Sequence, residues 1–262
     1  MTIIQSVILG FIQGLTEFLP VSSSGHLVLV QNLLGIDKNN PLIFTFDVLV
    51  HLGTLAAVIA IFWQDIVSLL KKPWQKLGLL IIMATIPTGI IGLSLKDFFE
   101  RLFQSDRFLG LEFIATGLII WFADRVRARA KGIEDISYFD AAFVGVMQGI
   151  AILPAISRSG LTIAGSLFRG INRETAARFS FLVSIPAIAG AAALDLKDVI
   201  GQGVPSGMGL PLLIGTIVAS LSGFWAVKFM IRILQRGSMK WFSYYVWVLG
   251  VLIIILQLGG KL

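Results

Sequence analysis

The first residues that could carry chemistry are Gln13 and Glu17, in the apolar N-terminal part of the chain. Their spacing of four residues places both side chains on one face of a helix. A carboxylate in apolar surroundings is costly and is usually tied to a function or to a charged partner. Glu17 could therefore act as a base or a metal ligand. Alternatively, it could pair with Arg158 and only hold two parts of the chain together.

The residues that follow Glu17 supply hydroxyl groups, backbone N–H groups and an imidazole. Three serines and a glycine lie directly before a short apolar stretch, and donors at the start of a helix form a cradle for an anion. The same residue types are common N-caps, so a purely structural role is the alternative. The second histidine, His51, lies in a long apolar segment, and we interpret it as a packing residue or a support for the site. The residues of the cradle are Ser22, Ser23, Ser24, Gly25 and His26.

A second polar loop, residues 154–162, repeats the cradle and adds Arg158. This arginine stands between small polar residues rather than at the edge of an apolar stretch, which argues against a side chain that reaches out to lipid headgroups. An arginine so placed suits bidentate binding of an anion, and phosphate matches its geometry. The candidate anion-binding residues of this loop are Ser157, Arg158, Ser159, Gly160 and Thr162.

Together the two loops offer a fixed cation, several hydroxyls, a carboxylate and an imidazole, a combination that suits a phosphorylated substrate. The arginine and the N–H groups would stabilise phosphoryl oxygens. A hydroxyl or the imidazole would attack, and the carboxylate would act as a base or hold a metal ion. The residues therefore predict a site for phosphoryl chemistry where the two loops face each other.

The composition places both loops inside a membrane protein. The chain of 262 residues is 56% hydrophobic and only 14% charged, whereas a soluble domain carries about a quarter charged residues. Its net charge of +6 arises in short loops between apolar segments, which indicates membrane topology rather than nucleic-acid binding. Six stretches are long enough to span a bilayer: Leu42–Trp63, Leu77–Leu95, Phe108–Phe122, Phe179–Leu196, Leu210–Met230 and Trp241–Leu258.

The stretches Met1–Pro20 and Phe139–Pro154 behave differently. Each runs into a proline and a Ser/Gly-rich loop before a short second apolar stretch, which is typical of a re-entrant hairpin. With two such hairpins, most basic residues fall on one side, which is then cytoplasmic. Both termini are accordingly expected on the extracytoplasmic side. That side receives Lys38, Lys96, Arg101, Arg107, Lys197 and Lys261.

The two hairpins also resemble each other in sequence. At a constant offset of 135, Gly10, Gln13, Gly14, Ser22, Ser24 and Gly25 recur as Gly145, Gln148, Gly149, Ser157, Ser159 and Gly160. Three spans separate the hairpins, and this odd number predicts an inverted second copy, with a polar site at the repeat interface. We predict an all-α polytopic membrane protein with six transmembrane helices and two re-entrant hairpins. It would form a single integral membrane domain, residues 1–262, with repeat units at about 1–130 and 136–262.

At these loops the chain resembles the bacterial undecaprenyl-diphosphate phosphatases of the bacitracin-resistance type. The family's first motif is present as QGLTEFLPVSSSGH at residues 13–26, and its second, PGxSRSGxT, as PAISRSGLT at residues 154–162. Both motifs are highly specific, and the resemblance covers essentially the whole chain. It implies hydrolysis of undecaprenyl diphosphate to undecaprenyl phosphate and inorganic phosphate in the bacterial cytoplasmic (inner) membrane. This reaction recycles the lipid carrier of peptidoglycan and other cell-wall polymer synthesis and confers bacitracin resistance. The site is then expected to open to the extracytoplasmic face, where the spent diphosphate appears.

The resemblance also implies partners and residue roles. The partners are the lipid substrate and membrane lipids, with no nucleic acid; whether the chain forms a homodimer stays open. Glu17 and Gln13 would position water or a divalent cation, Mg²⁺ or Ca²⁺. Ser23 or His26 would be the nucleophile or the acid–base group, and the sequence does not decide between them. Arg158, with Ser157 and Thr162, would hold the diphosphate.

Two departures from the family pattern affect the site. Gln13 stands where glutamate is common, which leaves Glu17 as the sole strong metal ligand. Ala155 stands where glycine is usual, which reduces backbone freedom but removes no chemical group.

Two other functions share features with this pattern. A transporter or flippase of polyprenyl phosphate is the alternative, because inverted repeats with half-helices at the midplane are the architecture of secondary carriers. A carrier needs only the anion cradle, whereas an enzyme also needs a nucleophile and a proton-transfer group, which Ser23, His26 and Glu17 provide. A lipid phosphatase of the phosphatidic-acid type needs a histidine six residues after its arginine. That position is Ala164 here, which excludes this rival.

Overall fold

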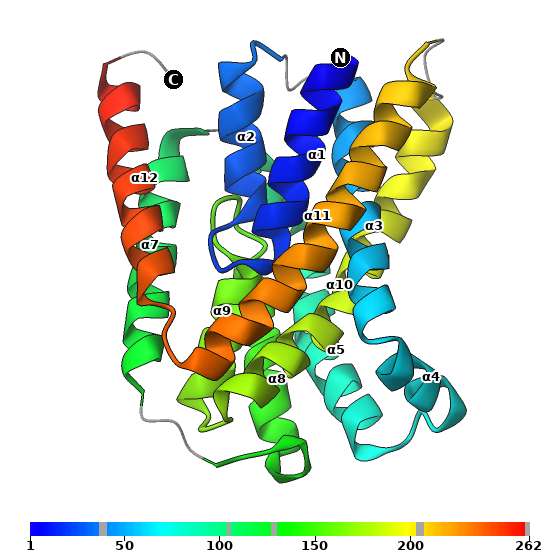
Figure 1. The fold of residues 1–262 in the computed structure, drawn as a ribbon, viewed down its shortest axis with the longest axis vertical. Helices are drawn as coiled ribbons and strands as arrows, with labels where there is room; N and C mark the ends of the chain where they lie inside the picture. Colours follow the sequence, from blue (N-terminus) through cyan, green and yellow to red (C-terminus); the bar gives the residue numbers. More distant parts are fainter. Residues whose placement is uncertain (37–40, 104–105, 127–129, 203–206, 260–262) are drawn as a thin grey trace.

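The computed structural model describes residues 1–36, 41–103, 106–126, 130–202 and 207–259, which form an all-α structure (Figure 1). Within these residues the β contacts are limited to one isolated parallel bridge between Lys131 and Ile171. The predicted all-α class is confirmed. The helices are α1 (Ile3–Phe18), α2 (Ser23–Leu33), α3 (Pro41–Ile61), α4 (Trp63–Lys71), α5 (Lys76–Ser94), α6 (Lys96–Phe103), α7 (Leu109–Arg125), α8 (Tyr138–Ile150), α9 (Arg158–Phe168), α10 (Arg173–Gln202), α11 (Gly209–Arg236) and α12 (Lys240–Leu258), with short 3-10 helices η1 (Asp106–Phe108) and η2 (Ile133–Asp135).

Five helices in the described part of the chain are long and apolar enough to cross a membrane. They cover Leu42–Ile61, Lys76–Ser94, Arg173–Gly201, Gly209–Gln235 and Lys240–Leu258, which correspond to five of the six predicted spans. The sixth predicted span forms α7, which at 17 residues lies at the short end of what crosses a bilayer. The chain is therefore a multi-pass helical membrane protein.

Two short helices, α4 and α6, lie outside the predicted spans, apart from Trp63, which ends the first span and begins α4. Each follows directly on the end of a long helix, α3 or α5. No residue of α4 is buried, and Trp63 and Leu70 of this helix are exposed, as is Trp74 beyond it. Exposed aromatic and basic side chains at the end of a span are typical of a helix at the membrane interface.

Both polar loops follow a helix that stops ahead of a proline. Helix α1 ends at Phe18, two residues before Pro20, and α8 ends at Ile150, four residues before Pro154. The residue before a proline avoids the helical region of backbone space, and the proline itself cannot donate the next helical hydrogen bond. The predicted breaks at both prolines are confirmed.

A serine N-cap restarts a helix after each loop. The Ser22 hydroxyl accepts the Gly25 N–H at 3.3 Å, and the Ser157 hydroxyl accepts the Gly160 N–H at 3.1 Å. These bonds satisfy backbone donors that would otherwise lack partners in the first turn of α2 and α9. Ser22 also has a φ of 68°, a left-handed conformation that is unusual for a residue other than glycine.

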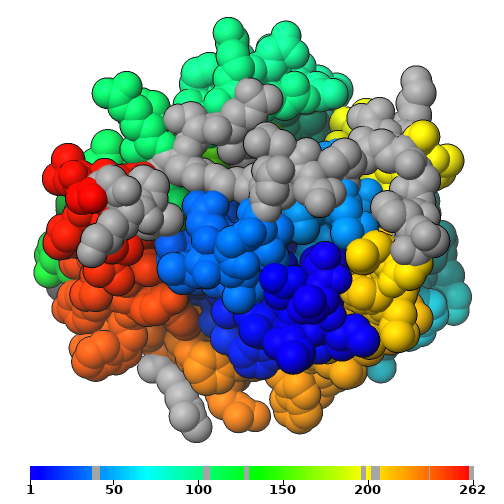
Figure 2. Space-filling view, turned by 90° about the horizontal axis from the view of Figure 1, so that it is seen from above, coloured from blue at the N-terminus to red at the C-terminus, as the bar shows by residue number. Residues whose placement is uncertain are grey.

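The two helix pairs enter from opposite ends of the bundle. Figure 1 shows α1 and α2 in the upper half and α8 and α9 in the lower half, with their connecting loops near mid-height. Seen from above, α1 and α2 lie in the middle of the face, with α12 to one side (Figure 2). The start of α1 and the end of α12 lie at the same end of the bundle. Of the basic residues expected at that end, Lys38 and Lys261 lie outside the described residues, as does the side chain of Lys197.

Glycines let the first helix of each pair pack closely on a long neighbour. A Cβ atom at Gly10 would lie 2.3 Å from the Gly215 carbonyl oxygen of α11, and one at Gly145 would lie 2.1 Å from the Ala84 carbonyl oxygen of α5. Only glycine permits such an approach between helices in a membrane. Gly10 and Gly145 are equivalent positions of the sequence repeat, so the repeat reflects a shared packing requirement.

Candidate functional site

A reciprocal pair of hydrogen bonds joins the two loops. The Ser24 hydroxyl donates to the Pro154 carbonyl oxygen, and the Ser159 hydroxyl donates to the Leu19 carbonyl oxygen at 2.8 Å. Ser24 and Ser159 are equivalent residues of the repeat, so each hairpin offers the same hydroxyl to the backbone of the other. Buried carbonyl groups need such partners. This pair of bonds, from Ser24 and Ser159, is called the clasp, and it fixes one loop against the other.

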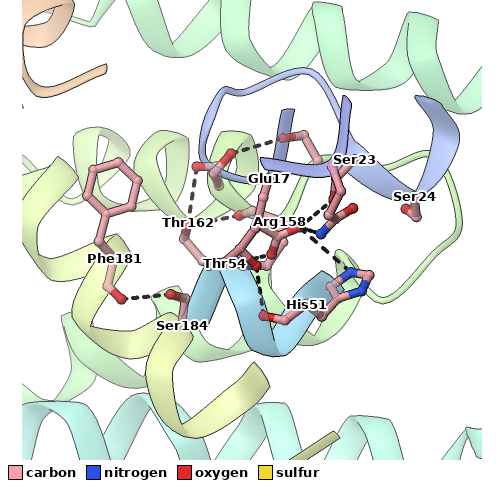
Figure 3. Close-up of polar contacts among 12 residues, drawn as sticks. Glu17, Ser23, Ser24, His51, Thr54, Arg158, Thr162, Phe181 and Ser184 are labelled. Carbon is pink, nitrogen blue, oxygen red and sulfur yellow. Dashed lines mark hydrogen bonds and ion pairs between the residues drawn. The ribbon is translucent and has the colours of Figure 1, made fainter. Parts of the chain in front are cut away.

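Glu17 is the centre of the site (Figure 3). Its Oε1 accepts a hydrogen bond from Arg158 Nη2 at 2.5 Å. Its Oε2 accepts bonds from the Ser23 hydroxyl at 2.5 Å and from the Gln13 amide at 2.8 Å. The side chains of Glu17 and Arg158 are 5% and 16% exposed. The ion pair that the sequence offered as an alternative role for Glu17 is therefore present, and it links the two loops.

Two polar atoms of this cluster are buried without a hydrogen-bond partner among the described residues. They are Nη1 of Arg158 and Oε1 of Gln13. A buried donor or acceptor left unpaired costs free energy, and such atoms in native proteins often mark a ligand site. The arginine therefore retains donor capacity for an anion after pairing with Glu17, and the amide oxygen retains acceptor capacity for a cation or a hydroxyl.

Of the two histidines, His51 lies beside Glu17 and His26 contacts other groups. His26 Nδ1 lies 2.6 Å from the Ser22 carbonyl oxygen, and its Nε2 lies 2.7 Å from the Tyr245 hydroxyl of α12. Because the carbonyl can only accept, Nδ1 donates, and in the neutral ring Nε2 accepts from the tyrosine. Both nitrogens are thus engaged. The imidazole beside Glu17 belongs to His51, whose Nε2 lies 3.7 Å from Glu17 Oε2.

The remaining predicted anion-binding residues mostly hold the loops in place. Ser22 and Ser157 are N-caps, and Ser24 and Ser159 form the clasp. The Thr162 hydroxyl lies 2.8 Å from the Arg158 carbonyl oxygen and 2.6 Å from the Ser180 hydroxyl. Among the described residues of the two loops, Ser23 is the serine that donates to Glu17, and Figure 3 places Ser24 away from this carboxylate. Gly25 and Gly160 lie in the first turns of α2 and α9.

The residues offer a small but usable set of ligands for a divalent cation. No group of three or more histidine, aspartate or glutamate side chains with metal-ligand geometry occurs in the described residues. Glu17 supplies one carboxylate, and the unpaired Oε1 of Gln13 supplies an amide oxygen. Mg²⁺ is commonly held by one or two carboxylates and completes its shell with water and substrate phosphate. The residues therefore fit a cation that is shared with a phosphorylated substrate.

Two polar residues of α7, outside the two sequence motifs, belong to the site. The Glu112 carboxylate accepts the Ala155 N–H at 3.0 Å, and the Thr116 hydroxyl accepts the Ser157 N–H at 3.1 Å. The sequence carries one signal for Glu112: it is an acidic residue near the start of a predicted span, where a charge is costly unless it has a role.

This geometry defines a class: a multi-pass helical membrane protein with a charged site buried between two broken helices. The chain matches the model of the family described as bacitracin resistance protein BacA over residues 6–252, and it belongs to this family. It is 58% identical over 259 residues to an undecaprenyl-diphosphatase of Carboxydothermus hydrogenoformans, with 98% of each chain covered. It is 46% identical over 258 residues to an undecaprenyl-diphosphatase of Halothermothrix orenii, again with 98% of each chain covered.

Proposed function

We propose that the chain hydrolyses undecaprenyl diphosphate to undecaprenyl phosphate and inorganic phosphate. The reaction recycles the lipid carrier of cell-wall synthesis and thereby confers bacitracin resistance. Family membership and the names of the relatives support this function. The observation that carries it is the unpaired Nη1 of Arg158 next to the Glu17–Ser23 pair, because an anion-binding donor, a hydroxyl and its proton acceptor then lie together.

In the proposed mechanism Arg158 binds oxygens of the terminal phosphoryl group and Ser23 is the nucleophile. The Ser23 Oγ attacks the terminal phosphorus, the bridging P–O bond breaks, and undecaprenyl phosphate leaves with the electron pair. The hydroxyl proton passes to Glu17 Oε2, 2.5 Å away. Water then attacks the phosphoserine, Oγ regains a proton from Glu17, and inorganic phosphate is released. His26, engaged at both nitrogens, holds the first loop.

Glu17 and Gln13 would hold the divalent cation, Mg²⁺ or Ca²⁺, through a carboxylate oxygen and the unpaired Oε1. When bound, such a cation neutralises charge on the diphosphate oxygens. The Gln13 amide also donates to Glu17 Oε2 at 2.8 Å. This bond orients the unpaired Oε1 of Gln13. The chain's own contribution is therefore one charged and one neutral oxygen on a single face of α1.

The proposed membrane arrangement has six spans, with α7 as the sixth, and re-entrant hairpins at α1–α2 and α8–α9. The glycine contacts of both hairpins and the meeting of their loops near mid-height support it. The hairpin of α1 and α2 then faces the extracytoplasmic side of the inner membrane, where the site opens. The basic residues near α4 lie on the cytoplasmic side.

Cysteine labelling tests this orientation, since the chain has no native cysteine. Leu33, at the end of α2, and Lys71, at the end of α4, are both exposed and lie at opposite ends of the bundle. In intact cells an impermeant thiol reagent is expected to label Leu33→Cys and to label Lys71→Cys only after lysis. The reverse pattern would invert the proposed topology.

Phosphate release by the purified protein tests the function itself. Undecaprenyl diphosphate in detergent micelles should yield undecaprenyl phosphate and inorganic phosphate in equal amounts. A protein that moves polyprenyl phosphate across vesicle membranes, but releases no phosphate, would instead be the carrier that the repeat architecture also allows.

A further inference from the structure

One turn of helix α7 contacts both polar loops. Its Glu112 and Thr116 face the second loop at the residues directly before Arg158. The Glu112 Oε2 accepts the Ala155 N–H at 3.0 Å. The Thr116 hydroxyl donates to the Ala155 carbonyl oxygen at 3.2 Å and accepts the Ser157 N–H at 3.1 Å. Three hydrogen bonds from α7 therefore hold the backbone that leads into the arginine.

Phe113, between these two residues in sequence, packs against the first loop. It is fully buried, and its ring meets the His26 ring edge-on with centroids 5.3 Å apart. A Cβ atom at Gly25 would lie 2.6 Å from its Cζ and 3.1 Å from the Ala155 Cβ. Gly25 is thus the point at which the first loop, the second loop and α7 converge, and Phe113 limits how closely the first loop approaches.

The free-energy cost of placing a polar side chain such as Glu112 among apolar helices indicates that its contacts have a role. A carboxylate among apolar helices is expensive, and Glu112 offsets part of this cost by lying in the first turn of α7, at the positive end of the helix. Its bond to the Ala155 N–H supplies a partner that a loop buried between helices needs. In the first hairpin, His26 of α2 contacts Tyr245 of α12, so the hydrogen bonds from α7 are a support of the second loop.

We propose that Glu112 and Thr116 are positioning residues that set Arg158 against Glu17, and that α7 thereby fixes the distance between the two halves of the site. Neither residue touches the reacting atoms; both act through the backbone of residues 155–157. The inference rests on the proposed phosphatase function. A misplacement of about 1 Å in a catalytic group can lower a rate about 100-fold, so the predicted effect is large for residues outside the reaction.

Thr116→Val is the central test, because valine keeps the shape of threonine and removes both hydrogen bonds to the loop. We expect it to lower kcat/KM for phosphate release by about 10- to 100-fold, and we expect Thr116→Ser to recover most of the loss. Thr88→Val is the matched control. Thr88 of α5 is also buried. Its hydroxyl donates to the Gly145 carbonyl oxygen of α8 at 2.8 Å and accepts from the Gln148 amide at 3.2 Å, so this variant likewise loses two hydrogen bonds to a neighbouring element, here to α8 rather than to the loop. Its activity should stay within about twofold of the wild type.

A double-mutant comparison separates positioning from general structural damage. If Thr116 acts through Arg158, then Thr116→Val should have much less effect in an Arg158→Lys background than in the wild type. Equal fold losses in the two backgrounds, or wild-type activity in Thr116→Val, would overturn the inference. If Thr116→Val fails to fold, the comparison of Glu112→Leu with Glu112→Gln replaces it, and the glutamine variant, which keeps an acceptor oxygen, should lose less activity. Failure of the wild-type protein to release phosphate would contradict the proposed function instead.

Discussion

Arg158→Ala is expected to lower kcat/KM for phosphate release from undecaprenyl diphosphate by about 10³-fold or more, because removing one preorganised donor to a developing charge already costs 10²–10³-fold. The variant loses the unpaired Nη1 and the Nη2 contact with Glu17 together. Arg158→Lys keeps a cation but not the planar fork, so it should retain more activity than the alanine variant.

The alanine variant also leaves Glu17 buried without its cationic partner, which destabilises a protein. Arg158→Ala combined with Glu17→Gln removes this unpaired charge. We expect the double variant to unfold at a temperature closer to that of the wild type and to remain inactive. Near-normal turnover in the Arg158→Ala protein would contradict the role assigned to the second loop.

Glu17→Gln is expected to reduce activity by about 10²- to 10⁴-fold, the usual range for loss of a proton-transfer group. The amide has the same shape, but it is a poor acceptor for the Ser23 proton and carries no charge for a cation. Phosphate release measured against Mg²⁺ concentration should therefore lose its cation-stimulated component. An unchanged Mg²⁺ titration would mean that Glu17 only anchors Arg158.

Local sequence rules accounted for the helix ends before the two polar loops. Proline positions predicted where α1 and α8 end. The glycines that the sequence showed as a repeat lie, in the structure, on the faces that pack on α11 and α5. These features depend on residues close together in the chain or on backbone sterics, so they can be read without coordinates. The pairing of Glu17 with Arg158 could be predicted for a different reason, because two opposite charges in an apolar region each need a partner.

The roles of individual serines and histidines could not be read in this way. N-caps, cross-loop clasps and anion ligands use the same residue types, so spacing did not single out Ser23 from Ser22 and Ser24. His26 is closest in sequence to the loop, yet it bonds Tyr245, more than 200 residues later. His51 is distant in sequence, yet the packing of α3 brings its Nε2 to 3.7 Å from Glu17. Only the tertiary packing of the helices decides these contacts.

The most direct test of the account is the identity of the phosphorylated residue during turnover. Acid quenching of the purified protein with undecaprenyl diphosphate, followed by peptide mass spectrometry, should find phosphate on Ser23, and Ser23→Ala should abolish both the adduct and steady-state phosphate release. Phosphate on His26, or full turnover by the Ser23→Ala protein, would contradict the proposed site.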